Sequence, residues 1–227
     1  MADAFFLRDG AGNGPSLKYA GADVVADQFG AWTPLGAEKV GSGYQVVWQN
    51  GGADQYVLWN VDSNGNWKSQ SDVVSGSAYA LQSLETTLQQ DFNADGTTGL
   101  KTTTIETAGV TDLVQVANEF FLRDGAGNGP SLKYAGADVV AGQFGAWTPL
   151  GAEKTANGYQ VAWQNGAADQ YVIWEVDNNG NERSITSLLA GESPVLQARE
   201  SILHQDLNHD TIIGQTSPDG ILEWWFG

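Results

Sequence analysis

Two short acidic segments contain residues whose types and spacing suit metal binding. In the first segment, Asp91, Asn93 and Asp95 occupy alternate positions, and Gly96 and Thr97 follow them. An EF-hand-type calcium loop uses side-chain oxygens at positions 1, 3 and 5, a glycine at position 6 and a backbone carbonyl at position 7. Calcium takes six or more oxygen ligands, and a tightly curled loop can point several of them at one centre. The spacing therefore predicts Ca²⁺ as a cofactor of this loop.

The second segment repeats the spacing, with Asp206, Asn208 and Asp210 as side-chain ligands and Ile212 as the carbonyl ligand. It differs at position 6, where Thr211 replaces the glycine. The sharp turn requires a positive φ there, which costs a β-branched residue about 1–3 kcal/mol. We therefore expect the second loop to bind calcium more weakly or not at all.

Both segments depart from the EF-hand pattern at position 12. Thr102 and Ser217 stand where a bidentate glutamate normally completes the shell. Glu85 and Glu200 lie six residues before the two loops. That separation is about 240° around a helix, so we expect both carboxylates to face away and not to substitute. The alternative interpretation is a polar turn that ends a helix and holds no metal.

The only two histidines, His204 and His209, flank the second segment, which raises the idea of a transition-metal site. The first segment has Gln89 and Ala94 at the equivalent positions. Solvated surface histidines are the interpretation that we favour.

No set of catalytic residues emerges. The chain has no cysteine, which excludes a thiolate nucleophile. Both histidines belong to the second half, so the two halves cannot share a Ser-His-Asp arrangement. We expect the protein not to be an enzyme.

The elements that position these loops belong to a module that is present twice. Residues 5–10 recur as residues 120–125, and the match continues without a gap through both acidic loops. We expect a first, N-terminally truncated module at 1–99, a second at 100–214, and a tail at 215–227 that begins a third repeat.

Within a copy, the pattern predicts strands first and a helix last. The segments 43–48 and 55–59 are aromatic and β-branched, and polar turns follow them at 49–52 and 62–66. Shorter strands are expected near 5–7, 17–19 and 23–25. The alternating segment 113–116 predicts a strand that opens the second copy.

A helix is expected directly before each acidic loop. Leu81, Leu84 and Leu88 form an apolar stripe at helical spacing, and Ser193 with Pro194 suggests an N-cap and a first helical residue in the second copy. The predicted fold class is therefore α+β and mostly antiparallel β. Each module is a β-meander sheet with one C-terminal helix and a calcium-type loop.

Nine tryptophans are many for 227 residues. Trp48 and Trp59, with their counterparts Trp163 and Trp174, fall on adjacent predicted strands, where aromatic pairing stabilises a sheet. The functional alternative is a platform on which sugar rings stack. Trp67 has a glutamate as its counterpart, so we expect it to be exposed and available for a ligand.

The net charge of −17 at pH 7 narrows the range of partners. A negative electrostatic field of this size repels nucleic acid and anionic membranes. The negative charge suits a protein that folds with divalent cations, although solubility alone would also explain it. No apolar run reaches the roughly 20 residues of a membrane span. The first residues also lack the pattern of a signal peptide.

Four segments, 129–134, 143–149, 158–163 and 204–208, resemble a tryptophan-rich repeat of large bacterial secreted or surface proteins of the RTX, hemolysin-type calcium-binding kind. The resemblance implies a secreted or cell-surface location, export without an N-terminal signal, and calcium-linked folding. The glycine-rich nonapeptides of RTX proteins are absent. The loops alone also resemble dockerin, but here they lie a whole module apart, which argues against a dockerin.

Three functions follow as expectations. The first is a non-catalytic, calcium-binding extracellular module that serves adhesion or attachment, with polysaccharide or a cell-surface glycan as partner. The second is a passive spacer that calcium rigidifies between neighbouring repeats of a larger protein. The third is an accessory domain of a secreted hydrolase.

Overall fold

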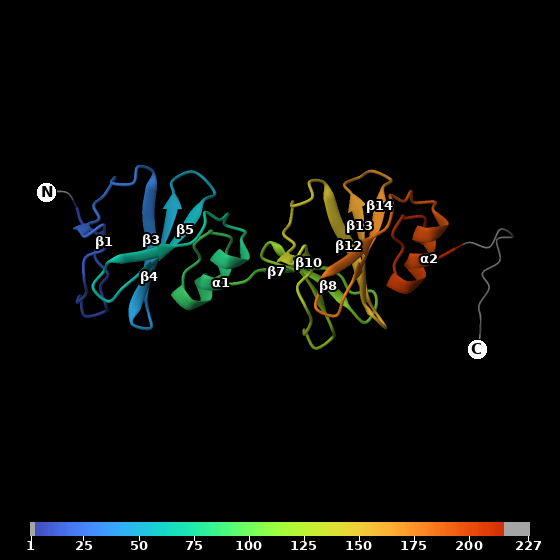
Figure 1. Cartoon of the computed structure of the whole chain (residues 1–227), viewed down its shortest axis with the longest axis horizontal. Coiled ribbons are helices and arrows are strands. Elements are labelled where there is room, and N and C mark those ends of the chain that lie inside the picture. The colour runs from blue at the N-terminus through green and yellow to red at the C-terminus, as the bar shows by residue number, and fades with distance from the viewer. Residues whose placement is uncertain (1–2, 216–227) are drawn as a thin grey trace. The chain divides into compact units, whose positions relative to one another are not determined.

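The computed structural model of the chain describes residues 3–215 and divides it into two compact units, Met1–Lys101 (unit 1) and Thr102–Gly227 (unit 2). Figure 1 shows that each unit runs from strands to a C-terminal helix. The expected start of a third repeat falls in the tail, where residues 216–227 lie outside the described part of the chain.

Each unit is built on a four-stranded antiparallel sheet whose strands are in sequential order, so the predicted meander is confirmed. The strands of unit 1 are β3 (Trp32–Val40), β4 (Gly43–Asn50), β5 (Tyr56–Val61) and β6 (Trp67–Gln70). The strands of unit 2 are β12 (Trp147–Thr155), β13 (Gly158–Asn165), β14 (Tyr171–Val176) and β15 (Glu182–Ile185).

The first strand of each sheet was not expected from the sequence. Pro34 and Gly36 interrupt the β-branched pattern of β3, and both residues disfavour a central strand. The strand forms because it lies at the sheet edge, where a proline need not donate a ladder hydrogen bond. A register shift between Pro34 and Gly36 accommodates the irregularity.

An N-terminal layer of short strands covers one face of each sheet. In unit 1 it contains the hairpin β1 (Lys18–Tyr19) and β2 (Ala22–Asp23), and in unit 2 the hairpin β10 (Lys133–Tyr134) and β11 (Ala137–Asp138). Unit 2 adds a three-stranded sheet of β7 (Thr102–Glu106), β8 (Asp112–Val116) and β9 (Glu119–Arg123). The strand expected at 113–116 is therefore confirmed.

The helix covers the other face. Helix α1 (Tyr79–Leu88) buries Leu81 and Leu88 against Val47 and Tyr56 of the sheet. Its counterpart is α2 (Pro194–Leu203) in unit 2. Ser193 occupies the N-cap of α2, but its side chain makes no capping hydrogen bond, so only the position of the helix start was predicted correctly.

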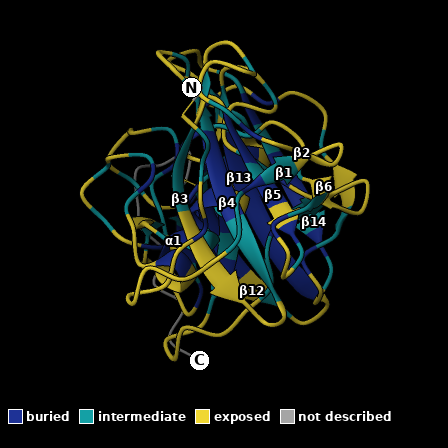
Figure 2. Cartoon of the chain, turned by 90° about the vertical axis from the view of Figure 1, so that its left-hand side faces the viewer, coloured by how far each residue is buried: buried dark blue, intermediate teal, exposed yellow. Residues whose placement is uncertain are grey.

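Alternation along the strands gives the sheet two cores. Val46 and Trp48 of β4 face the N-terminal layer, while Val47 between them faces the helix. Both faces of the middle strands are thereby packed, which explains why Val46, Val47 and Trp48 are consecutive buried apolar residues. Figure 2 shows the buried middle strands and the exposed end of β3.

Among residues 3–215, no helix has the length and apolar character that crossing a membrane requires.

Candidate calcium loops and aromatic pockets

Each acidic loop starts directly after a helix, because the residue at the C-cap adopts a left-handed conformation that reverses the chain. These residues are Gln89 at φ 52° and His204 at φ 55°. The amide of the next residue, Gln90 in unit 1, then donates to the carbonyl of Glu85, which fixes the start of the loop against the last helical turn.

In unit 1 the three predicted side chains curl around the loop backbone. Asp91 accepts from the amides of Asp95, at 3.3 Å, and Gly96, at 3.0 Å. Asn93 accepts from the same Asp95 amide at 3.0 Å, and Asp95 accepts from the amide of Thr97 at 2.9 Å. Oxygens from positions 1 and 3 therefore converge on the amide of Asp95.

The second loop has the same geometry. Asp206 accepts from Asp210 and Thr211, Asn208 accepts from Asp210, and Asp210 accepts from Ile212. Thr211 adopts φ 76°, so the strain predicted at position 6 is confirmed. The threonine has not changed the path of the loop, and its cost falls on stability instead.

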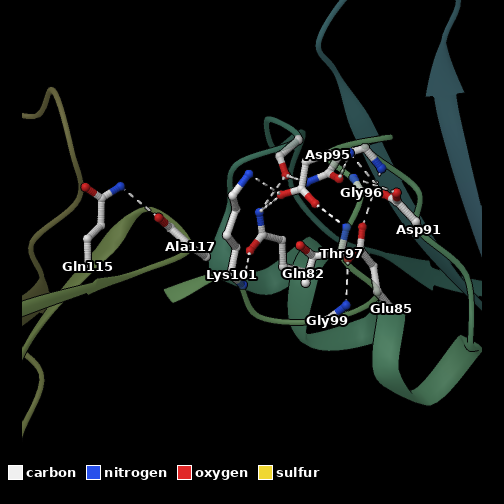
Figure 3. A network of polar contacts seen from close by, with 12 residues as sticks. Gln82, Glu85, Asp91, Asp95, Gly96, Thr97, Gly99, Lys101, Gln115 and Ala117 are labelled. Atoms are coloured by element: carbon white, nitrogen blue, oxygen red, sulfur yellow. Dashed lines mark hydrogen bonds and ion pairs between the residues drawn. The ribbon is translucent and has the colours of Figure 1, made fainter. Parts of the chain in front are cut away.

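The carboxylates expected to face away from the loops in fact support them. Glu85 is fully buried and accepts from the amides of Phe92, Asn93 and Gly99 at 3.0, 3.4 and 3.0 Å. Glu85 does not face away from the loop as predicted, because the chain leaves the helix axis after Leu88. Glu85 is thus an internal brace whose oxygens bind the loop backbone (Figure 3).

Glu200 braces the second loop in the same way, accepting from Leu207, Asn208 and Gly214. The sequence contained a signal for this role. Glu200 lies four residues after Leu196 and three before Leu203, so it shares the apolar stripe of its helix. A charged residue on that stripe must find buried partners.

The donor atoms fit a hard cation. Carboxylate and amide oxygens with backbone carbonyls are the ligands that calcium prefers, whereas zinc takes nitrogen and sulfur. Within residues 3–215, no three His, Cys, Asp or Glu side chains are grouped closely enough to hold a metal ion. Any calcium in the loop therefore depends on amide, carbonyl and water oxygens as well.

The two loops differ in the charge beside position 5. Lys101 places its ammonium 3.7 Å from a carboxylate oxygen of Asp95, and Gln82 donates to the same oxygen at 3.4 Å. In the second loop the equivalent oxygen of Asp210 accepts from the Asn208 side chain. The positive charge of Lys101 in the first loop therefore competes with a metal for Asp95.

The two histidines lie beside the second loop without forming a cluster with it. His204 is mostly exposed, and its Nδ1 lies 3.8 Å from the Glu153 carboxylate. His209 takes a left-handed conformation at loop position 4, as Ala94 does in the first loop.

The predicted tryptophan pair forms the centre of an aromatic cluster in each unit. Trp48 and Trp59 are 2% and 6% exposed, and their ring centroids lie 4.6 Å apart. Trp163 and Trp174 repeat the contact at 4.7 Å. These four side chains are core residues, not an open platform, and they reach the surface only as walls of a pocket.

That pocket recurs in both units. In unit 1 it has a volume of about 360 Å³ and is lined by the aromatic side chains of Tyr19, Phe29, Trp32, Trp48 and Trp59. In unit 2 it has a volume of about 250 Å³ and is lined by Tyr134, Phe144, Trp147, Trp163 and Trp174. Tyr19 and Tyr134 are each 37% exposed at its rim.

Trp67 is half-buried and not exposed as expected. Its ring packs against Tyr19 and Trp59, at 5.3 and 6.5 Å between centroids. The turn at residues 62–66 folds β6 back along β5, which brings Trp67 onto the aromatic cluster. It therefore extends the core of unit 1 beyond that of unit 2.

Fold and site together define a tandem tryptophan-rich module, with one four-stranded sheet, one helix and one braced acidic loop per copy. The family described as the tryptophan-rich Synechocystis species C-terminal domain matches residues 1–99 and 110–214. The chain belongs to this family, with one copy of the domain in each half. A comparison with curated proteins gives no match.

Proposed function

We propose that this chain is a non-catalytic, calcium-binding tandem module of a larger secreted or cell-surface protein of the RTX kind. The observation that carries the proposal is the identical hydrogen-bonding path of both acidic loops, with oxygens at positions 1, 3 and 5 curled inward. The extracellular setting supplies millimolar calcium, the range in which extracellular modules bind it.

Calcium would act on stability. Each loop gathers two carboxylates within five residues of a chain that already carries a net charge of −17. A divalent cation removes this repulsion and fixes the loop to the helix through the glutamate brace. A ligand present at 100 times its Kd stabilises the folded state by about 2.7 kcal/mol.

A calcium titration with thermal unfolding tests the proposal. We expect the melting temperature to rise in millimolar calcium and to fall back with chelator. Asp91→Asn and Asp206→Asn report the two loops separately, because each substitution removes one charged ligand. No change of melting temperature in millimolar calcium would exclude the calcium function.

Lys101 offers a matched control for the first loop. Its ammonium lies 3.7 Å from an Asp95 carboxylate oxygen, and the helix brace is a different side chain, Glu85. We expect Lys101→Met to strengthen calcium binding at the first loop and to leave the second loop unchanged. Isothermal titration calorimetry measures calcium binding at each loop separately when Lys101→Met is combined with Asp91→Asn or with Asp206→Asn, because each of these changes weakens one loop.

For the biological role we propose adhesion, with the aromatic pockets receiving a carbohydrate. Supporting observations are the repetition of the pocket in both units and the half-exposed tyrosine at each rim. Flat aromatic faces suit the apolar faces of sugar rings. A glycan array with the wild type and with Tyr19→Ala and Tyr134→Ala tests this role, and uniform silence would favour a passive spacer or the accessory domain of a hydrolase.

A further inference from the structure

A polar pocket lies at one end of the sheet of unit 2, where β12 passes into β13 and β14 passes into β15. It has a volume of about 860 Å³, and most of its lining comes from the segments 110–111, 124–130, 154–159 and 178–181. Among the described residues, it shares none with the aromatic pocket of the same unit or with the acidic loop. The polar pocket is therefore a separate feature of the fold.

Lys154, near the end of β12, supplies a cation to the polar pocket. Its ammonium lies 4.4 Å from the centre of the Tyr159 ring and donates to the Tyr159 hydroxyl at 3.1 Å. Tyr159 is 6% exposed and belongs to the core cluster of Trp163 and Trp174, so it holds the ammonium at a fixed place. Within residues 3–215, no ion pair joins Lys154 to a carboxylate. Because an ammonium has three donors, two remain for a ligand.

Lys133, the second lysine of the polar pocket, is already engaged. Its ammonium donates to the carbonyl and the hydroxyl of Ser131 at 3.3 and 2.7 Å, and to the carbonyl of Asn179 at 3.2 Å. It also lies 3.7 Å from a carboxylate oxygen of Asp138. Its three donors are therefore used to fix the turn after β14 against the hairpin of β10 and β11, which leaves Lys154 as the cation for a ligand.

Asp124 supplies the opposite charge. Its Oδ1 accepts from the amides of Ala126 and Asn128, both at 2.9 Å, so the glycine-rich loop 124–130 curls around the carboxylate. The Asn128 amide and then the Ala126 amide hold the pKa of the Asp124 carboxyl below its ordinary value of 3.8, and the charge of Lys154 acts in the same direction. The carboxylate is therefore ionised at neutral pH and is an acceptor on the wall of the pocket.

Two neutral amides complete the polar lining. Asn178 and Asn179 lie in the turn between β14 and β15, and both are exposed. Among the described residues, only the backbone of Asn179 has hydrogen-bond partners, and the side-chain amides of both residues have none. The side chain of Asn181, by contrast, is fixed because it donates to both carboxylate oxygens of Asp177. Each free amide offers a carbonyl oxygen and two N–H donors to a ligand.

These groups select the class of ligand. A single free ammonium beside a carboxylate, in a chain with a net charge of −17, disfavours phosphates and polyanions. The Tyr159 ring is buried and has the ammonium over its face, so that face is not available to a flat aromatic ligand. Donors and acceptors in one pocket suit hydroxyl groups instead, because each hydroxyl donates one hydrogen bond and accepts up to two. The lining therefore fits a neutral ligand with many hydroxyl groups.

We propose that the polar pocket of unit 2 is a binding site for a neutral saccharide. Lys154 donates to hydroxyl or ring oxygens of the sugar, and Asp124 accepts from its hydroxyls. Asn178 and Asn179 bind further hydroxyls. The volume of about 860 Å³ lies within the range of about 300–1,000 Å³ that ligand pockets occupy. This second site rests on the proposed adhesion function for its biological setting alone, because its four residues do not line the aromatic pockets.

A residue-resolved NMR titration of the full-length chain with maltotriose, cellotriose and mannotriose tests this site. We expect at least one of these neutral trisaccharides to shift the side-chain amide signals of Asn178 and Asn179 and the backbone signals of residues 124–130. The indole signal of Trp163 reports the aromatic pocket of unit 2 in the same spectra. Tyr134→Ala alters the aromatic pocket, and we expect it to leave the response of the polar pocket unchanged. Failure of one pocket is thereby distinguished from failure of the other.

Substitution of Lys154 gives the sharpest test. Lys154→Met should weaken saccharide binding in the polar pocket by about tenfold or more, because a hydrogen bond from a charged group is lost. Lys39→Met is the matched control, since residues 32–39 of unit 1 are identical in sequence to residues 147–154, and we expect it to leave the affinity at unit 2 unchanged. Asn178→Ala removes a neutral partner from an exposed turn, and it should weaken binding by about fivefold without affecting folding.

Three results would overturn this assignment. The first is the absence of any shift at residues 124–130 and 178–181 with millimolar amounts of all three saccharides. The second is an equal affinity of the wild type and Lys154→Met. The third is tighter binding of glycine or inorganic phosphate than of every saccharide, because the pocket would then be a site for a zwitterion or an anion.

Discussion

Glu38 and Glu153 occupy the same position in two identical eight-residue segments, yet one is exposed and the other is almost completely buried. The difference arises outside the segment, because only Glu153 receives the donors of the β7–β8 hairpin. The burial of a residue on this edge strand therefore depends on whether a hairpin packs against the edge, and not on the sequence of the strand. The helix, its brace and its loop are by contrast alike in both units.

The largest expected loss of stability tests whether the helix, brace and loop are equivalent in the two units. Glu85→Ala removes the buried acceptor of three backbone amides, two of them in buried hydrogen bonds. We expect unit 1 to lose about 3 kcal/mol or more of unfolding free energy. Glu200→Ala should cost unit 2 a similar amount. Hydrogen exchange, followed separately in each unit, measures both losses of unfolding free energy. A large difference between the two losses would show that the glutamate braces of the two units are not equivalent.

The next effect tests the difference between the units. Glu153→Ala leaves the Val110 amide and the Thr111 hydroxyl without their acceptor, and we expect a cost of about 2 kcal/mol to unit 2. Glu38→Ala should change the stability of unit 1 by no more than about 0.5 kcal/mol, because its side chain is exposed. Chemical denaturation of the two variants checks the prediction, and equal costs would contradict it.

A smaller effect is expected at loop position 6. Gly96 and Thr211 have φ angles of 85° and 76°, so both lie in the region that favours glycine. Thr211→Gly should stabilise unit 2 by about 1 kcal/mol, and Gly96→Thr should destabilise unit 1 by a similar amount. Thermal unfolding without calcium isolates this backbone effect, and a destabilised Thr211→Gly variant would refute it.

The smallest effect concerns pH and occurs only in unit 2. Burial raises the pKa of the Glu106 carboxyl above its ordinary value of 4.5, since desolvation outweighs its two amide donors. Its contribution to stability is therefore complete below that value and is lost as the pH rises through the folded pKa. We expect the wild type to lose stability relative to Glu106→Gln as the pH rises through this range, because the glutamine does not titrate. A wild type that gains stability relative to the variant would show that the sign is wrong.

Much of the fold could be predicted from the sequence. The aromatic runs predicted the middle strands, the polar turns predicted the meander, and the leucine stripe predicted the helix. Pro34 and Gly36 concealed β3, because a propensity argument cannot tell that a strand will lie at an edge. The Trp67 environment was missed for a related reason, since its neighbours come from another part of the chain.

The path of the acidic loops could be predicted from the sequence, but the residues that support them could not. The spacing of Asp91, Asn93 and Asp95 was sufficient to foresee a curled loop. The role of Glu85 could not be predicted from helical angles, because a left-handed residue ends the helix after Leu88. A carboxylate on an apolar stripe is the better signal, and it requires no knowledge of where the chain turns.

The way the chain leaves unit 1 has a mechanical consequence. Gly99 donates its amide to Glu85, and Lys101 donates its amide to the buried side chain of Gln82, so two points of the exit are fastened to the middle of α1. A pulling force applied beyond Lys101 therefore loads the helix and its packing on the sheet before it reaches the acidic loop. The loop keeps its shape under tension that would straighten a free linker.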